Sequence, residues 1–491
     1  MRTASVVRTF CYTESVLTMK NKTIKNILIV SITLTVLVGA TVALILATRK
    51  HPAKADPAHC SHHFEETESI AASEFAPGTI KYKCSQCGEE KIDRKYATGK
   101  LPQIYFDGTL DGIGKDSAVP MKAEYVDSNQ NFDSFATIKY QGHTAMNYDK
   151  KNYTLKLFED ENNKEKYKVS LHGWNKSNKY CLKANYIDFS QARNVVSNNI
   201  WSEVVSSRKN LDSNIADLQF KGAIDGYPIM VFINDEYQGV YTMNIPKDED
   251  TYNIGDDEGE ALFVINSPSS DSAHFKSKLT EEDKKTIYDL EYCYGDDDSW
   301  AYNSLDNLID FVNKNDGESF KKGIGKHLDV DAAIDYLITT YYIGVTDNFA
   351  KNVLLITYNG EKWIPSLYDL DTACGLAFDG SKNYGADYLL PKKSADGSLD
   401  SASDSLLWDK ILNNYPNEIK ARYFELRKGA LDTEKTISKF ETFINGIPRE
   451  CYDKDLEIWG DIPLHDKNNI EQIKSYLSER SSLLDKFFDS L

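Results

Sequence analysis

The chain has 491 residues, of which 41% are hydrophobic and 12% aromatic, and its formal net charge is −18. This composition excludes a disordered protein, and the length exceeds that of one ordinary domain. The acidic balance, without a basic helix or an RNA-binding aromatic motif, argues against a nucleic-acid partner. Eight cysteines are too few for a chain of this length to be a small disulfide-stapled secreted protein.

An uncharged apolar segment occupies residues 26–48. A helix of about 20 apolar residues spans a bilayer, and this segment is longer than the apolar core of a cleaved signal peptide. We therefore expect a cytoplasmic tail over residues 1–25 and a single-pass transmembrane helix over residues 26–48, with the main domain extracytoplasmic. Basic residues flank both ends, and Arg2 and Arg8 favour an inside N-terminus, although the reverse orientation and a start at Met19 stay open.

The next segment, residues 49–98, has the pattern of a linker that carries a small Cys/His module. A C-x-x-C pair followed by Gly88 makes the tight turn that places two thiolates on one zinc ion, and the module resembles a bacterial zinc ribbon. The candidate ligands of this closed structural site are Cys60, His62, Cys84 and Cys87. His63 is an alternative to His62, and a local disulfide is the alternative to zinc.

Residues 101–491 are expected to form the main domain, which begins with strands. The segments LPQIYFDG, FATIKYQG and KNYTLKLF place β-branched and aromatic residues between turn residues. Residues 179–204 have the pattern of a strand and then a helix, and a hairpin with its turn at Glu236 follows. The segment 108–117 (GTLDGIGKDS) misses the spacing of a phosphate-binding loop and is interpreted as a turn.

The second half of this domain has more helical character. Residues 327–345 show helical periodicity with a strong apolar face, and residues 459–491 have the pattern of a closing amphipathic helix. Between them, VLLITY, Asn359-Gly360 and EKWIPSLYD predict a β-hairpin. The sequence thus predicts an α+β fold with a β-rich first part and a helix-rich second part.

Carboxylates flank this hairpin in an order that suits phosphoryl transfer. Asp347 and Asn352 precede it with D-x4-N spacing, and Asp369 and Asp371 stand at its end. Protein kinases place their catalytic Asp, a metal-binding Asn and a second metal-binding Asp in this order. Because hard oxygen ligands prefer Mg²⁺ or Mn²⁺, Asn352 with Asp369 or Asp371 is a candidate metal site and Asp347 a candidate catalytic base.

Several blocks in fixed order resemble the CotH family, the atypical protein kinases known from spore coats. The resemblance spans roughly residues 101–491. Its blocks are YQGHTAMNYDKKNYTLKL (140–157), LKANYIDFSQARN (182–194), FINDEYQGVYTM (232–243), TDNFAKNVLL (346–355), WIPSLYDLDTACGL (363–376) and WGDIPLHDKNNIEQIKSYLSERSSLLDKFF (459–488). Membership implies an atypical, two-lobed protein-kinase-like fold and the same roles for the acidic residues around the hairpin.

The resemblance also implies a nucleotide site that binds ATP. Lys151 and Lys156 are both candidates for the lysine that faces the phosphates. The D-x4-RN block, Asp188, Arg193 and Asn194, implies either nucleotide binding or a role in holding the lobes together. The chain departs from the family where Thr144, Ala145 and Met146 replace the usual Ser and Arg, and it has no evident Gly-rich loop, so an inactive member is an alternative.

Three functions are compatible with these patterns. The first is a metal- and ATP-dependent protein kinase that phosphorylates Ser or Thr of a surface or spore-coat protein. The second is a non-catalytic surface module that binds a polymer or a protein partner through the β-rich part. The third is a metal-dependent hydrolase of phosphate esters that uses the same carboxylates.

Overall fold

The computed structural model describes residues 57–142, 144–255, 257–460, 462–465, 467 and 469–491. The chain divides into two compact units, one reaching Ala72 and including Pro77–Tyr96, and the other containing Ser73–Ala76 and Ala97–Leu491. The expected tail (1–25) and transmembrane helix (26–48) lie outside the described residues. Within the described ranges, no helix is both long and apolar enough to cross a membrane.

The first unit contains one small antiparallel sheet. After a short 3-10 helix, η1 (Pro57–His59), its strands are β1 (Phe64–Ile70), β2 (Gly78–Cys84) and β3 (Glu90–Lys95). They are ordered β1-β2-β3, and β2 pairs with both neighbours. Every residue of β1 is exposed.

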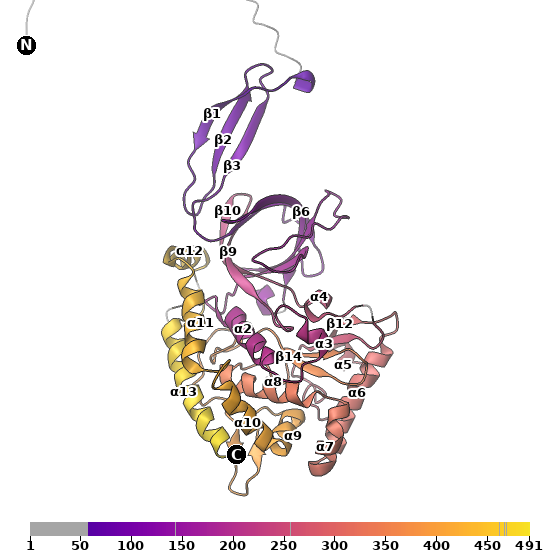
Figure 1. The fold of residues 1–491 in the computed structure, drawn as a ribbon. Helices are drawn as coiled ribbons and strands as arrows, with labels where there is room; N and C mark the ends of the chain where they lie inside the picture. The colour runs from indigo at the N-terminus through magenta and orange to yellow at the C-terminus, as the bar shows by residue number, and fades with distance from the viewer. Residues whose placement is uncertain (1–56, 143, 256, 461, 466, 468) are drawn as a thin grey trace, which may run out of the picture. The chain divides into compact units, whose positions relative to one another are not determined.

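The second unit begins with a closed seven-stranded barrel in the order β10-β8-β7-β6-β5-β4-β9 (Figure 1). Its strands are β4 (Gln103–Asp107), β5 (Val119–Val126), β6 (Asn131–Gln141), β7 (Asn152–Phe158), β8 (Lys179–Lys183), β9 (Gly226–Ile233) and β10 (Glu236–Asn244), and the 3-10 helix η2 (Thr144–Asn147) precedes β7. All neighbours pair antiparallel except β4 and β9, which are parallel. Buried and more exposed side chains alternate along a barrel strand, because successive residues point to opposite faces. On β5, Val119, Met121, Ala123 and Tyr125 are buried, while Pro120 and Lys122 are exposed.

A four-stranded antiparallel sheet and most of the helices form the rest of this unit. The sheet is ordered β12-β11-β13-β14, from β11 (Ala261–Ile265), β12 (Tyr288–Cys293), β13 (Val353–Thr357) and β14 (Ile364–Leu367); β15 (Lys392–Lys393) and β16 (Leu399–Asp400) form a separate pair. The helices are α2 (Arg193–Ser206), α3 (Ser213–Ala216), α4 (Glu249–Tyr252), α5 (Asp283–Thr286), α6 (Ser299–Lys314), α7 (Gly317–Gly323), η3 (Ile324–Lys326), α8 (Val330–Ile343), α9 (Leu406–Asn414), α10 (Pro416–Leu426), α11 (Thr433–Asn445), α12 (Arg449–Trp459) and α13 (Ile470–Asp489).

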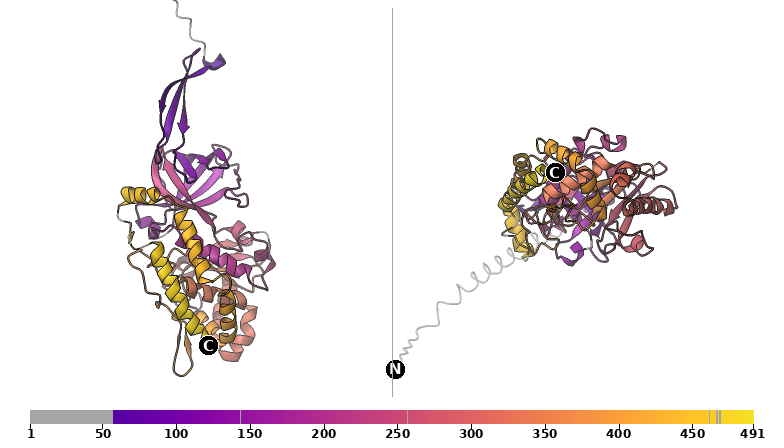
Figure 2. Two further views of the ribbon diagram at one scale, coloured as in Figure 1. Left: turned by 60° about the vertical axis from the view of Figure 1, so that its left-hand side comes forward. Right: turned by 90° about the horizontal axis from the view of Figure 1, so that it is seen from below.

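Helix α8 is the centre of this helical region. It packs against α2, α9, α10, α13 and β14. Helices α11 and α13 lie side by side at the outer edge of the helical region (Figure 2). The Asp329 side chain caps the α8 N-terminus by accepting from the Ala332 amide, and Gly344 ends the helix in the left-handed conformation. Twelve of its fourteen residues are buried, which explains why the sequence shows so strong an apolar pattern there.

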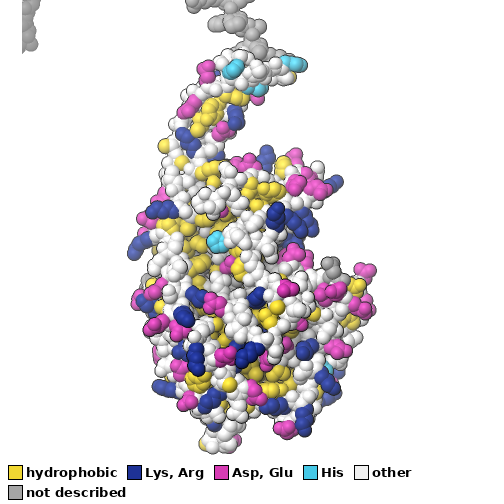
Figure 3. Space-filling view, viewed as in Figure 1, with side chains coloured by type: hydrophobic (Ala, Val, Ile, Leu, Met, Phe, Trp, Pro, Cys, Tyr) yellow, Lys and Arg dark blue, Asp and Glu magenta, His cyan; other side chains and the backbone are white. Residues whose placement is uncertain are grey.

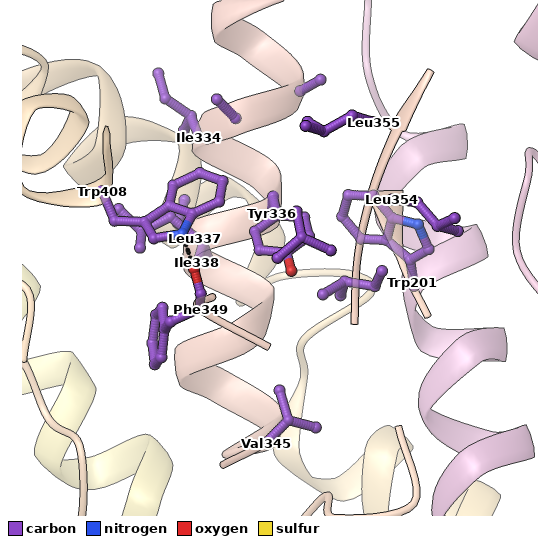
Figure 4. Packing of buried hydrophobic residues seen from close by; sticks show 14 of the residues in the cluster. Trp201, Ile334, Tyr336, Leu337, Ile338, Val345, Phe349, Leu354, Leu355 and Trp408 are labelled. Atoms are coloured by element: carbon purple, nitrogen blue, oxygen red, sulfur yellow. Dashed lines mark hydrogen bonds between the residues drawn. The ribbon is translucent and has the colours of Figure 1, made fainter. Parts of the chain in front are cut away.

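Aromatic packing around α8 fixes the chain segment that follows it (Figure 4). The Tyr336 ring stacks on Trp408 at 4.7 Å between centroids, and Trp201 of α2 meets Tyr336 edge-on. The Trp408 indole donates a hydrogen bond to the Phe349 carbonyl at 2.8 Å, and the Tyr336 hydroxyl donates to the Asn348 carbonyl at 2.6 Å. The core therefore holds the two residues that follow Asp347.

The predicted α+β class and the main elements are confirmed. The helix expected at 327–345 is α8, the expected hairpin is β13–β14, and the strand and helix at 179–204 are β8 and α2. The closing helix expected over residues 459–491 is α13, which begins at Ile470; Trp459 is the last residue of the preceding helix, α12.

Candidate active site

A cavity of about 820 Å³ lies in the second unit, between the barrel and the β11–β14 sheet. Its volume falls within the range of about 300–1,000 Å³ typical of small-molecule sites. Side chains of both charges line it: the basic residues are Lys115, Lys139, Lys150, Lys183, Lys247, Lys285 and Lys351, and the acidic residues are Asp116, Asp289, Glu291, Asp347, Asp369 and Asp371. Such a wall suits an anionic ligand that carries bound cations.

Asp369 and Asp371 enter the cavity at the end of β14, as the sequence predicts. Asp369 adopts a left-handed backbone conformation with φ of 54°, which few residues other than Gly, Asn and Asp tolerate. Such strained positions cluster at functional sites. Lys183 of β8 faces this carboxylate, with 3.5 Å between Nζ and Oδ1.

The neighbouring carboxylate of Asp369 raises the proton affinity of Asp371. Burial, and then the charge of Asp369, raise the pKa of Asp371 well above its ordinary value, although Lys183 works in the opposite direction. Burial alone would lower the pKa of Lys183, but Asp369 and nearby acidic groups raise it. A half-buried set of acidic side chains that repel one another is the electrostatic environment that a bound cation relieves.

Asp347 and Asn352 lie on the segment that joins α8 to β13, and both line the same cavity. Lys351 donates to Asp347 Oδ2 at 2.7 Å. The buried Asn352 has φ of 55°, and its amide donates to the Ile265 carbonyl at 2.6 Å. The Asn348 side chain donates to the Tyr368 carbonyl at 2.8 Å, so the segment that carries Asp347 is tied to the residue before Asp369.

The D-x4-RN block connects α2 to the site. The Asn194 Oδ1 accepts from the Leu370 amide at 2.9 Å, and Asn194 also lines the cavity. Asp188 and Arg193 are fully buried and paired with each other, and neither lines the cavity. The Arg193 guanidinium instead donates to the Ala373 carbonyl at 2.8 Å. Of the two roles that the resemblance implied for this pair, the contacts match that of holding parts of the domain together.

The structure does not bring Lys151 or Lys156 to the cavity wall. The Lys151 ammonium donates to the carbonyls of Met146, at 2.8 Å, and Tyr148, and so closes the η2 turn. Lys156 is exposed on β7, on the same face as Asn152 and Thr154 but farther from the cavity, which those two residues line.

Lys183 was not among the candidates from the sequence, although it lines the cavity 3.5 Å from the Asp369 carboxylate. The signal that could have indicated it is its position at the end of β8, the strand before α2, because protein kinases carry the lysine that faces the phosphates on a strand before a helix. The loop at 108–117, interpreted as a turn, likewise contributes Lys115 and Asp116 to the cavity wall.

The four predicted zinc ligands converge in the first unit. The ligand atoms of Cys60, His62, Cys84 and Cys87 all lie within 4.8 Å of one another. Burial would raise the pKa of the Cys84 thiol, but hydrogen bonds from backbone amides lower it to about 5. Histidine side chains gather at one end of this unit (Figure 3).

Comparison with known proteins identifies the family. A search of curated proteins found no match. Residues 138–484 match the family described as CotH kinase protein, and this range contains every residue of the carboxylate site. The match covers most of the chain, and the chain therefore belongs to the CotH kinase family.

Proposed function

We propose that this chain is a metal- and ATP-dependent protein kinase that transfers the γ-phosphate of ATP to Ser or Thr of a protein. The observation that carries the proposal is the convergence of Asp347, Asp369 and Asp371 with Lys183 in one cavity of a CotH-family chain. Asp347 and Asp369 flank the β13–β14 hairpin, whereas Lys183 belongs to the barrel, so it is the fold that brings the lysine to the carboxylates.

The donors fit a hard divalent cation. Asn352, Asp369 and Asp371 offer oxygen atoms, the preference of Mg²⁺ and Mn²⁺, and the repulsion that raises the pKa of Asp371 is the property a cation relieves. These three residues would hold the metal, which supplies charge neutralisation between the phosphate groups when bound.

The remaining residues have separate roles in the proposed reaction. Lys183 contacts a phosphate oxygen, and Asp347 accepts the proton of the attacking Ser or Thr hydroxyl as the new P–O bond forms and ADP leaves. Lys351 keeps Asp347 in place through the 2.7 Å contact. Asn194 orients the backbone at Leu370, between the two metal-binding carboxylates.

The architecture and cellular setting form part of the same proposal. The barrel and the helical region, with the cavity between them, are the two lobes of an atypical kinase-like fold. The apolar segment 26–48 anchors the chain, and the main domain acts outside the cytoplasm on a surface or spore-coat protein.

The test compares the wild-type chain with an Asp369→Ala/Asp371→Ala variant. Calorimetry with ATP, with and without Mg²⁺ or Mn²⁺, is expected to show metal-dependent binding in the wild type and none in the variant. Asp347→Asn is expected to bind ATP normally while transfer of labelled γ-phosphate to a Ser-rich acceptor falls by about 10²–10⁴-fold. Absence of ATP binding by the wild type with either metal would overturn the proposal and leave a non-catalytic binding module.

A further inference from the structure

The described part of the first unit, residues 57–72 and 77–96, has no apolar core of its own. Among its described residues only Gly78, Cys84 and Cys87 are buried, while Ile70 and Ile92 are 52% and 63% exposed. This described part has fewer than about 40 residues, and a folded segment of that size usually needs a disulfide or a metal. The buried positions of this sheet are thus two thiols and a glycine, and its stability calls for a cross-link.

The spacing of the thiols fits a metal better than a disulfide. Two thiolates on a tetrahedral zinc ion with Zn–S bonds of 2.3 Å are about 3.8 Å apart, and Cys60 Sγ lies 3.7 Å from Cys84 Sγ. A disulfide would need about 2.05 Å between the sulfurs. The His62 Nδ1 lies 3.3 Å from Cys87 Sγ, so the imidazole nitrogen is close to the three sulfur atoms and can complete the set of four ligands.

The turn between β2 and β3 is built to present two thiolates. Gly88 has φ of 84°, which favours glycine, and its amide donates to the Cys84 carbonyl at 2.8 Å. The Cys84 amide in turn donates to the Glu89 carbonyl at 2.7 Å, and the Glu89 amide approaches Cys87 Sγ at 3.5 Å. Backbone amides directed at sulfur stabilise a thiolate, the form that binds metal.

Glu89 completes the site from behind the histidine. Its carboxylate lies 3.4 Å from His62 Nε2, while the opposite ring nitrogen faces Cys87. A metal-bound histidine commonly donates its other N–H to a carboxylate, which fixes the tautomer and the ring orientation. The neighbouring His63 is not part of the cluster of converging ligand atoms, and its backbone carbonyl accepts from the Ser85 amide at 2.9 Å.

From this geometry we propose that Cys60, His62, Cys84 and Cys87 bind one structural zinc ion, with Glu89 as the positioning residue for His62. Four protein ligands close the tetrahedron and leave no open position for catalysis. The ion joins the segment before β1 to the β2–β3 turn, and so replaces the apolar core that the sheet lacks. Binding of the ion and folding of the sheet are therefore coupled.

The experiment uses the full chain, purified under reducing conditions, stripped of metal and titrated with Co²⁺ and then Zn²⁺. The expected result is one thiolate-bound ion per chain, seen as the charge-transfer and d–d absorption of a tetrahedral cobalt–thiolate site, and loss of that spectrum on addition of Zn²⁺. Cys84→Ser and Cys87→Ser are expected to abolish the spectrum, whereas His63→Ala and Cys293→Ser, the matched controls, retain it. Asp347→Asn retains it as well, since the site is independent of the kinase proposal.

Glu89→Gln provides a second test of the proposal if Cys84→Ser or Cys87→Ser does not fold. It is expected to bind Co²⁺ with the wild-type stoichiometry and an affinity about 10–100-fold lower. Three results would overturn the proposal: no thiolate spectrum in the reduced wild-type chain, full retention in Cys84→Ser and Cys87→Ser, or wild-type affinity in Glu89→Gln. Protection of the β1–β3 region from proteolysis only when Zn²⁺ is present would support the coupling to folding.

Discussion

Replacing Lys183 by methionine removes the cation that faces Asp369 while it preserves the length and apolar stem of the side chain. The residue is 14% exposed and its ammonium lies 3.5 Å from the Asp369 carboxylate. If Lys183 contacts phosphate, ATP loses a charge-assisted hydrogen bond in the variant, whereas the protein loses only a pair whose carboxylate is 32% exposed. Binding should therefore suffer more than stability.

The two effects differ in size. A hydrogen bond to a charged group contributes about 1.5–3 kcal/mol, and at 1.4 kcal/mol per tenfold the Kd for ATP with Mg²⁺ should rise about 10–150-fold. An ion pair with one partner a third exposed contributes at most about 1 kcal/mol. The free energy of unfolding of the metal-free variant should therefore change by no more than that amount.

Calorimetric titration of ATP at fixed Mg²⁺ measures the first quantity, and urea unfolding without metal measures the second. Lys156→Met is the matched control because Lys156 is an exposed strand lysine outside the cavity wall, and its affinity for ATP should equal that of the wild type. The reasoning is refuted if Lys183→Met binds ATP as the wild type does, or if Lys156→Met shows the loss instead.

Two further predictions concern charged side chains inside the domain. Asp371→Asn should stabilise the metal-free chain by about 0.5–2 kcal/mol, because it removes the repulsion from Asp369. Mg²⁺ should raise the Tm of the wild type but not that of the variant, and a lower Tm for the metal-free variant than for the metal-free wild type would contradict the explanation. Asp455→Ala should cost about 3–5 kcal/mol in urea unfolding, because Lys150, 1% exposed and 2.6 Å from Asp455, is left unpaired. Lys150→Met/Asp455→Leu should recover most of that loss, and equal damage from the single and double variants would count against the ion-pair explanation.

Local sequence pattern was sufficient to predict α8 and the β13–β14 hairpin. Helix α8 and the β13–β14 hairpin combine a continuous apolar pattern with clear end signals, the Asp329 cap and Gly344 for the helix and Asn359-Gly360 for the hairpin. Closure of the barrel could not be predicted in the same way. It depends on the parallel pairing of β4 with β9, strands more than a hundred residues apart in sequence, and no local signal specifies that contact.

Prediction of the site succeeded where the residues adjoin one hairpin and failed where they come from the barrel. Asp347, Asn352 and Asp369 belong to a short stretch whose geometry a hairpin determines. Lys183 reaches the site only because β8 is paired between β7 and β10, a register that periodicity does not give. The sequence left Lys151 and Lys156 as equal candidates, Lys156 because YTLK can be aligned with the V-A-I-K strand of ordinary kinases and Lys151 because it lies in the family's own block, and neither residue lines the cavity.

Gly239, in the block FINDEYQGVYTM (232–243), has a packing role and does not line the cavity. Its φ is 106°, and a Cβ there would stand 2.2 Å from Asp455 Oδ1. Asp455 of α12 can therefore approach β10 only over a glycine, where it accepts from the Val240 amide at 2.9 Å and pairs with Lys150. Since Lys150 directly precedes the lysine that closes the η2 turn, this buried pair fixes the barrel edge of the cavity against a helix near the end of the chain. The arrangement of the cavity thus depends on contacts from the barrel, the hairpin and α12 together, and a fragment without α12 would leave Lys150 as a buried, unpaired charge.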